Sequence, residues 1–139
     1  MGYISGCFVG LLLIYSAGYL RADSLLLSIP NGLSTISNPY DHGDNSVGAL
    51  FPASPEGLQL YTFDAPTQRW KVNQFQFGAW GDSGQILQPH QAAFIRNPSN
   101  EFLILFTGNA VSNIPPTIHQ GNNFISALPP PELLDAIYK

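Results

Sequence analysis

The chain has 139 residues, which suits one domain with a buried core. Only 10% of the residues are charged, whereas 45% are hydrophobic and 12% aromatic, a balance that is too apolar for a disordered chain. The formal net charge is -4 and the five basic residues are scattered singly, so the sequence has no basic patch that could hold a nucleic acid.

Residues 1–22 have the pattern of an export signal. The segment begins without a charged side chain, and residues 7–17 form an apolar core of the length of a signal h-region. The segments Ser16-Ala-Gly18 and Leu20-Arg-Ala22 each offer a cleavage site, and use of the second leaves Asp23 as the first mature residue. An uncleaved signal anchor is the alternative, because the uncharged run approaches the thickness of a bilayer. We expect a secreted or cell-surface protein whose only membrane contact is this segment.

The cysteine, glycine and proline content indicates what can stabilise the fold. The only cysteine is Cys7, inside the N-terminal apolar run, so the remainder of the chain forms no internal disulfide and no cysteine-ligated metal site. The 13 glycines and 12 prolines suit turn-rich β-structure. Such a domain has to be stabilised by packing.

Two short apolar runs, 24–29 and 33–38, are bounded by turn formers and predict a β-hairpin. The phrase at 29–39 returns in degraded form at 118–129, with a glycine-bearing turn, an alternating run ending in Ile-Ser and a proline. This repetition predicts strands in equivalent positions. We expect residues 123–127 to pair near 33–38, or to stand as an exposed edge strand that recruits a second chain.

The polar loop that follows has two interpretations. Asp41, Asp44 and Asn45 offer carboxylate and amide oxygens within five residues, a weak candidate Ca²⁺ site that lacks the ligand spacing of an EF-hand loop. The preferred interpretation is an Asx-rich turn that caps a short helical turn over 47–51, with Asp44, Asn45 or Ser46 as the N-cap.

The middle of the chain alternates with period two. Residues 57–63 and 69–74 both alternate around a short turn, which predicts an antiparallel hairpin, and both faces carry apolar side chains. Residues 75–85 contain three glycines among large aromatics and are expected to form a loop. Residues 92–96 and 102–107 are expected to be strands, and the unbroken apolar run of the second is typical of a central strand.

Tyr61, Trp70 and Trp80 are the candidate ligand or partner contacts. Exposed aromatic side chains on a secreted sandwich are suited to stacking on sugar rings, and Trp80 lies between small residues in the expected loop. The alternative is that these side chains fill the core of a disulfide-free domain, which is the preferred interpretation for Trp70.

Residues 81–84 read Gly-Asp-Ser-Gly, which is similar to the nucleophile segment of chymotrypsin-like proteases, and His42 and Asp64 lie upstream in the matching order. Those enzymes need two barrels, and the following position is Gln85 where their motif has glycine. A turn is the preferred interpretation. A hydrolase centred on Ser83 is therefore only a third functional hypothesis.

Several phrases carry a resemblance that spans most of the chain after residue 22. They lie at 32–39, 60–63, 87–95, 103–108 and 121–129. Their order resembles a group of uncharacterised bacterial secreted and surface β-domains built from repeated Gly-aromatic-Asn/Ser-aliphatic-Ile-Ser-x-Pro units. This chain has His90 where their Pro-Gly-x-Gly pattern has its first glycine. The resemblance implies an extracytoplasmic module of structural or adhesive character and brings no catalytic residues.

The sequence predicts one all-β domain over 23–128, an antiparallel β-sandwich or small barrel of about seven to nine strands, followed by a Pro-rich tail at 129–139. The leading functional hypothesis is a non-catalytic extracellular or cell-surface structural or interaction module. The alternative is a carbohydrate-binding module that uses exposed aromatics. Self-association through an edge strand or a surface polysaccharide would supply the partner, and we expect no nucleic acid, metal or other cofactor.

Overall fold

The computed structural model describes residues 23–111 and 117–125, which form a two-sheet β-sandwich. The expectations about the export signal and the Pro-rich tail lie outside these residues. The elements in chain order are β1 (Asp23–Ile29), β2 (Gly32–Ser37), β3 (Tyr40–Asp41), α1 (Val47–Leu50), β4 (Gln59–Asp64), β5 (Arg69–Gln76), β6 (Ala79–Trp80), β7 (Ala92–Asn97) and β8 (Phe102–Ala110). The eight strands of the described residues confirm the predicted all-β class.

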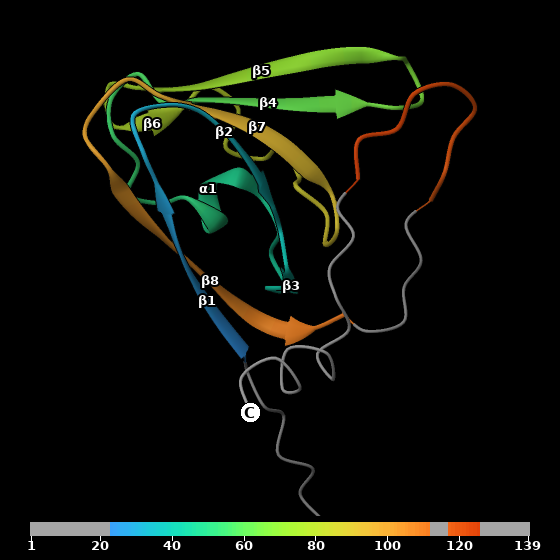
Figure 1. The fold of residues 1–139 in the computed structure, drawn as a ribbon, viewed down its shortest axis with the longest axis horizontal. Coiled ribbons are helices and arrows are strands. Elements are labelled where there is room, and N and C mark those ends of the chain that lie inside the picture. Colours follow the sequence, from blue (N-terminus) through green and yellow to red (C-terminus); the bar gives the residue numbers. More distant parts are fainter. Residues whose placement is uncertain (1–22, 112–116, 126–139) are drawn as a thin grey trace, which may run out of the picture.

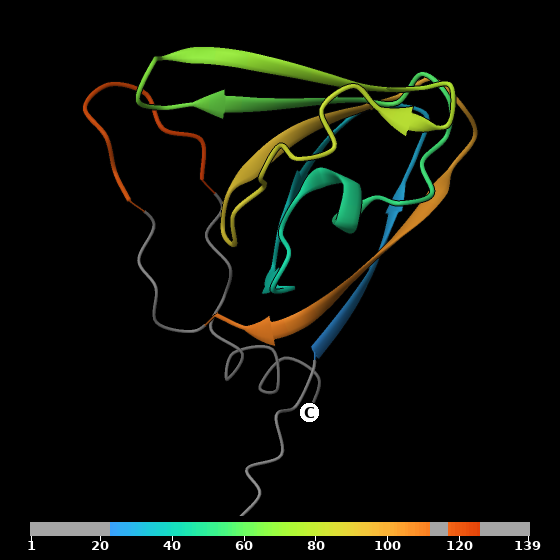
Figure 2. The ribbon, with the colours of Figure 1, turned by 180° about the vertical axis from the view of Figure 1, so that it is seen from behind.

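The two sheets are antiparallel throughout. One has three strands in the order β1-β8-β3, and the other has five strands in the order β2-β7-β4-β5-β6. The sheets approach each other at the end that carries the β1–β2 and β7–β8 connections and diverge toward the opposite end, with α1 between them (Figure 1). The view from behind shows the same wedge and the same position of α1 (Figure 2).

The predicted hairpin over 24–29 and 33–38 is wrong, although both strands exist. β1 pairs with β8 and β2 pairs with β7, so the chain changes sheets between them. The buried amide of Asn97 holds this corner, because its Nδ2 donates to the carbonyl oxygens of Ile29 and Pro30 (3.2 Å each) and of Asn100 (2.8 Å). Adjacent strands form a hairpin only when they share a sheet, and alternation alone does not reveal the sheet.

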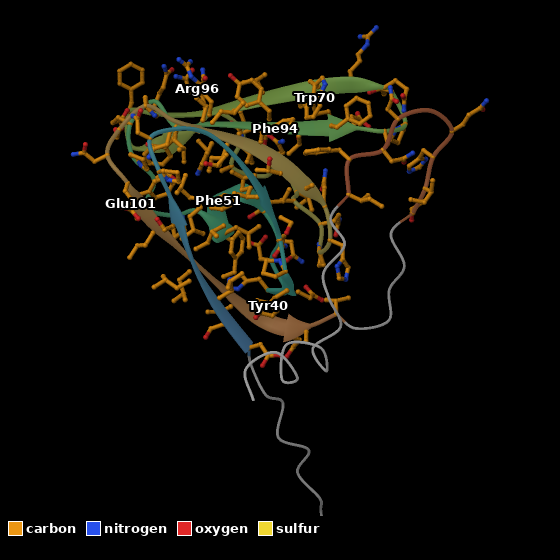
Figure 3. The ribbon with its side chains drawn as sticks, viewed as in Figure 1. Tyr40, Phe51, Trp70, Phe94, Arg96 and Glu101 are labelled. Atoms are coloured by element: carbon orange, nitrogen blue, oxygen red, sulfur yellow. The ribbon has the colours of Figure 1, made fainter. Side chains whose placement is uncertain are left out.

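The short helix α1 is capped as predicted and packs its buried side chains into the core between the sheets. Ser46 is the N-cap, and its side chain accepts from the backbone N–H of Ala49 at 3.3 Å. Leu50 and the following Phe51 are buried between the sheets, and Figure 3 places Phe51 inside the wedge. The ring of Phe51 lies edge-on to Phe106 of β8, with centroids 5.8 Å apart.

Trp80 is a core residue, so its assignment as an exposed contact is wrong. Residues 75–85 are not a loop throughout: β5 extends to Gln76 and pairs with β6, which sets Trp80 opposite Phe75. Trp80 is only 7% exposed, its ring centroid lies 5.6 Å from that of Phe75, and its Nε1–H donates to the carbonyl oxygen of Phe51 at 3.0 Å. The satisfied indole N–H is what permits such burial.

The turn between β5 and β6 carries an exposed phenylalanine in a strained conformation. Phe77 and Gly78 both have positive φ (55° and 76°), as a type I′ turn requires. The carboxylate of Glu56 accepts from both backbone N–H groups, at 3.0 and 2.7 Å. Phe77 is 99% exposed, so its side chain contributes no packing that would offset the strain.

Replacing Phe77 with asparagine should stabilise the domain. Asparagine tolerates the left-handed region and is favoured in type I′ turns, so the free energy of unfolding should rise by about 0.5–1 kcal/mol. Chemical denaturation measures the change, and Phe77→Ala is the matched control because alanine also disfavours positive φ. An equal gain in both variants would contradict the explanation by backbone strain.

Among the described residues, none belongs to a helix with the length and hydropathy needed to cross a membrane.

A candidate ligand-binding groove

Residues 117–125, called the arm below, return to the five-stranded sheet beside the β4–β5 turn (Figure 1). The side chain of Gln68 in that turn holds the arm. Its Nε2 donates to the carbonyl oxygens of Asn122 (3.0 Å) and Gln120 (3.4 Å), and its Oε1 accepts from the N–H of Asn122 at 2.8 Å. Gly121 has a φ of 99°, and a Cβ there would lie 2.6 Å from Gln68 Oε1, so the contact requires glycine.

Hydrogen bonds within the arm also stabilise its conformation. The Asn123 side chain accepts from the backbone N–H of His119 at 2.9 Å and donates to the carbonyl oxygens of His119 (2.8 Å) and Gly121 (3.2 Å). These bonds satisfy backbone groups that have no strand partner. The arm therefore has a defined turn conformation of its own.

Phe124 anchors the arm in an aromatic cluster on the outer face of the five-stranded sheet. Its ring centroid lies 4.8 Å from that of Phe94 and 5.5 Å from that of Trp70. Trp70 also lies 5.5 Å from Phe94 and 5.1 Å from Phe63. Figure 3 shows Trp70 and Phe94 on the sheet near the arm. The cluster thus joins β4, β5, β7 and the arm.

The preferred interpretation of Trp70 as a core residue is wrong, because it lies on the outer face and is 47% exposed. Asn73 and Phe75 are the buried members of β5, and Trp70 lies on the opposite face of the strand because it is an odd number of residues away from both. Tyr61 lies on the same outer face, opposite Phe94, where it is half-buried and donates its hydroxyl to Gln59 Oε1 at 2.9 Å. Both remain contact candidates.

The repeated phrase does not form equivalent strands. Its first copy makes the sheet-changing corner and β2, whereas the described part of the second copy makes the arm. Ile125 forms a bridge with Gln91, just before β7, and not with residues 33–38 as predicted. Residues 126 and 127 lie outside the described residues.

An open groove of about 740 Å³ lies between the arm, the 82–91 segment and the ends of β3 and β4. Carboxylates, amides, hydroxyl and imidazole groups line it, together with Phe63 and Phe124 of the aromatic cluster. Its principal side chains are Asp41, Thr62, Phe63, Asp64, Lys71, Asp82, Gln85, Gln88, His90, Gln91, His119, Asn123 and Phe124. Such a mixture of apolar surface and hydrogen-bonding groups is typical of small-molecule sites.

A buried asparagine fixes the loops beneath this groove. Asn38 donates from Nδ2 to the carbonyl oxygen of Leu87 (2.9 Å) and to Asn45 Oδ1 (3.1 Å), and its Oδ1 accepts from the N–H of Tyr40 at 3.3 Å. Its backbone N–H donates to the carbonyl oxygen of Gln91 at 3.3 Å. The satisfied amide joins the 38–45 loop to the 87–91 loop and makes the groove's base rigid.

His90 lines the groove and has a left-handed backbone conformation, which is unfavourable for residues other than glycine. It has a φ of 66° in a β-turn closed by the Gln91 N–H and the Gln88 carbonyl oxygen at 3.0 Å, with Pro89 before it. Glycine would adopt this backbone conformation freely. His90 Nε2 lies 2.9 Å from the carbonyl oxygen of Val111 and so carries the proton. Strain retained with a hydrogen-bonding side chain is typical of functional positions.

The segment of the weak Ca²⁺ candidate is a turn whose carboxylates accept hydrogen bonds from the turn itself. Asp41 Oδ1 accepts from Asn45 Nδ2 (2.8 Å) and from the N–H of Gly43 (2.9 Å), and Asp44 Oδ1 accepts from the N–H of Ser46 at 3.0 Å. The Asn45 bond and then the Gly43 bond lower the pKa of Asp41, and the Ser46 bonds lower the pKa of Asp44. The described residues contain no group of three or more acidic, histidine or cysteine side chains arranged to hold a metal ion.

The protease-like motif is not assembled into a triad. His42 Nδ1 lies 3.1 Å from the carbonyl oxygen of Thr107, and Asp64 pairs with Lys71 Nζ at 3.3 Å. The carbonyl oxygen of Ser83 accepts from the N–H of Gly48 at 2.9 Å, and within residues 23–111 and 117–125 no hydrogen bond joins its hydroxyl to either side chain. The turn that contains Ser83 thus has a structural role, because the Ser83 carbonyl oxygen helps to position α1.

Comparison of the chain with protein-family models, curated proteins and solved structures finds no match to any of them. The resemblance to secreted bacterial β-domains therefore stays a prediction. The groove, the arm and the Gln68 contact were not anticipated from the sequence. The one available signal was glycine at 121 in a polar segment, which indicates a special backbone conformation but not the residue it contacts.

Proposed function

We propose that the chain is a non-catalytic interaction module of the cell exterior that binds a carbohydrate in the groove. The N-terminal segment with its export pattern supports a location outside the cytoplasm. The groove supports the ligand class, although its residues differ from the aromatics that the sequence suggested.

The observation that carries this proposal is the chemistry of the groove's lining. The amides can donate and accept and the carboxylates can accept hydrogen bonds, as sugar hydroxyls require, and Phe63 and Phe124 add apolar surface for the C–H faces of a ring. Lys71 pairs with Asp64 at 3.3 Å, and Asp41 and Asp82 leave the lining with an excess of negative charge. A neutral polyhydroxylated ligand therefore fits this lining better than an anionic one.

The groove is also preorganised. Gln85 Nε2 donates to Thr62 Oγ1 at 2.6 Å, and the Asn38 and Gln68 contacts hold the neighbouring loops and the arm. Groups already fixed in place lose little entropy on binding, which allows several weak hydrogen bonds to give useful affinity.

A glycan array followed by titration calorimetry tests the proposal. Gln88 and His119 are exposed groove residues whose side chains are available to a ligand. Alanine at either position should weaken binding about tenfold, which corresponds to one lost hydrogen bond of about 1.4 kcal/mol. Gln76→Ala is the matched control, because Gln76 is an exposed glutamine on β5 outside the groove.

Two results would overturn the proposal. The first is an array on which no glycan binds, and the second is binding that Gln76→Ala weakens as much as Gln88→Ala. Covalent labelling of Ser83 by a fluorophosphonate would instead favour the hydrolase hypothesis.

A further inference from the structure

Apart from the charge of Asp23 at its start, the edge of the three-stranded sheet at β1 lacks the features that normally protect an edge strand. β1 pairs with β8 on one side, and no other strand of the described residues pairs with it. Residues 24–29 contain no charged residue, no proline and no glycine, and their register against β8 is continuous, without a bulge. Charges, prolines and bulges are the usual means of preventing edge-to-edge pairing.

The outer face beside this edge is apolar. Leu26 lies opposite Leu105, and both leucines are 59% exposed. Leu103 is exposed on the same face of β8. Three neighbouring exposed leucines on a small sheet form a patch of the kind that marks an interaction surface.

The inner side of the same edge is also open. A shallow apolar depression of about 370 Å³ lies where the sheets diverge, between β1 and β2. It is lined by Leu25, Leu27, Thr35, Ile36, Ser37, Ala92, Phe124 and Ile125. Both faces of β1 thus expose leucine next to free backbone groups.

The sequence of β1 is a palindrome at its centre, because residues 24–28 read Ser-Leu-Leu-Leu-Ser. In an antiparallel pair, opposite residues lie on the same face of the sheet. A twofold axis between two β1 strands therefore has to lie midway between two copies of the same residue, and it is named below by that residue. An axis through Leu26 sets Leu26 against Leu26, Leu25 against Leu27 and Ser24 against Ser28. An axis through Leu25 or Leu27 would instead oppose leucine to serine.

We propose that β1 pairs with β1 of a second copy of this chain, antiparallel and about a twofold axis through Leu26. The pairing joins two three-stranded sheets into one sheet of six strands and satisfies the free backbone groups of both edges. The two copies of Leu26 become neighbours between their Leu105 partners, and the inner leucines close the depression. This interface does not involve the polar groove, so it adds to the proposed function and does not depend on it.

Sedimentation velocity over a range of concentrations tests the interface, using protein expressed from the complete coding sequence. The wild type should form dimers, and Leu26→Lys should raise the dissociation constant about tenfold or more, because it brings two charges together at the axis. Leu33→Lys is the matched control: Leu33 is 66% exposed on β2, at the edge of the other sheet. It should dimerise like the wild type.

A second pair of variants tests the register. Ser24→Lys with Ser28→Lys opposes like charges across the axis, whereas Ser24→Glu with Ser28→Lys opposes unlike charges and should dimerise more tightly by about tenfold or more. Lysine at 28 also suits its neighbour within the chain, because the Ser28 hydroxyl bonds to the Glu101 carboxylate.

Three outcomes would overturn the proposal. One is a wild type that stays monomeric up to about 1 mM, a concentration above that of specific association. Another is a Leu33→Lys variant that loses association as fully as Leu26→Lys, which would point to the other sheet. The last is equal association of the two double-serine variants, which would place the contact away from this register.

Discussion

Alanine at position 108 should destabilise the sandwich by about 3–5 kcal/mol, the largest effect we expect from a single methyl group in this chain. Gly108 lies in β8, next to the point where β3 pairs with that strand. A Cβ there would lie 2.4 Å from the carbonyl oxygen of Asp41 and 2.7 Å from its carbonyl carbon. These are backbone atoms and cannot rotate away, so β3 would have to separate from β8.

Chemical denaturation measures this loss, and Gly43→Ala is its control. Gly43 also has positive φ (86°), but a Cβ there meets no atom within 4 Å, so alanine should cost only about 1 kcal/mol through backbone strain. Equal losses in the two variants would show that strain, and not the contact with β3, determines the result. Because Asp41 also lines the groove, Gly108→Ala should weaken ligand binding as well.

Alanine at position 124 should release the arm while leaving the sandwich folded. Phe124 contributes the arm's ring contacts with Phe94 and Trp70, and their loss should lower the free energy of arm opening by about 1–3 kcal/mol. The core between the sheets does not include this residue, so global stability should change far less. The polar groove would lose one wall, and carbohydrate binding should fall sharply.

Hydrogen exchange and fluorescence report this release directly. Amides of the arm should lose protection, and the emission of Trp70 should shift to longer wavelength as its ring becomes exposed, while buried Trp80 stays constant. Ile118→Ala is the control, because Ile118 is an exposed arm residue outside the aromatic cluster. Protection that survives in Phe124→Ala would show that Gln68 alone holds the arm.

Local patterns in the sequence predicted local structure well. The alternation on both sides of residues 65–68 predicted β4 and β5 closely, and the Ser46 cap with its helical turn was one of the stated alternatives. These features depend on neighbouring residues, whose spacing is visible in the sequence. The all-β class followed from them together with the abundance of turn formers.

Arrangements between distant residues were not predictable in the same way. The corner at residues 30–31 reads as a hairpin turn, since nothing nearby shows that the buried amide of Asn97 will bond to it. Trp80 reads as a loop residue among glycines, because the two-residue strand β6 is too short for its alternation to be seen. Each error reflects a partner that lies far along the chain.

The groove was the least predictable feature for the same reason. Its polar side chains come from β3, β4, β5, the 82–91 segment and the arm, and no one of these segments supplies enough of them to indicate a binding site. The Asx-rich turn and the turn at 81–84 were predicted as turns, but the convergence of the segments on one site depends on Asn38 and Gln68. Those residues look ordinary in the sequence.

The pairing of β1 with β8 also bears on how the molecule is made. Ile29 lies opposite Phe102 and Asp23 opposite Gly108, so the first of the described strands has to wait for the last of them before its sheet exists. Such non-local pairing slows folding, because a long loop closes before any contact compensates for the lost entropy. The sandwich therefore cannot be completed before residue 108 has been synthesised.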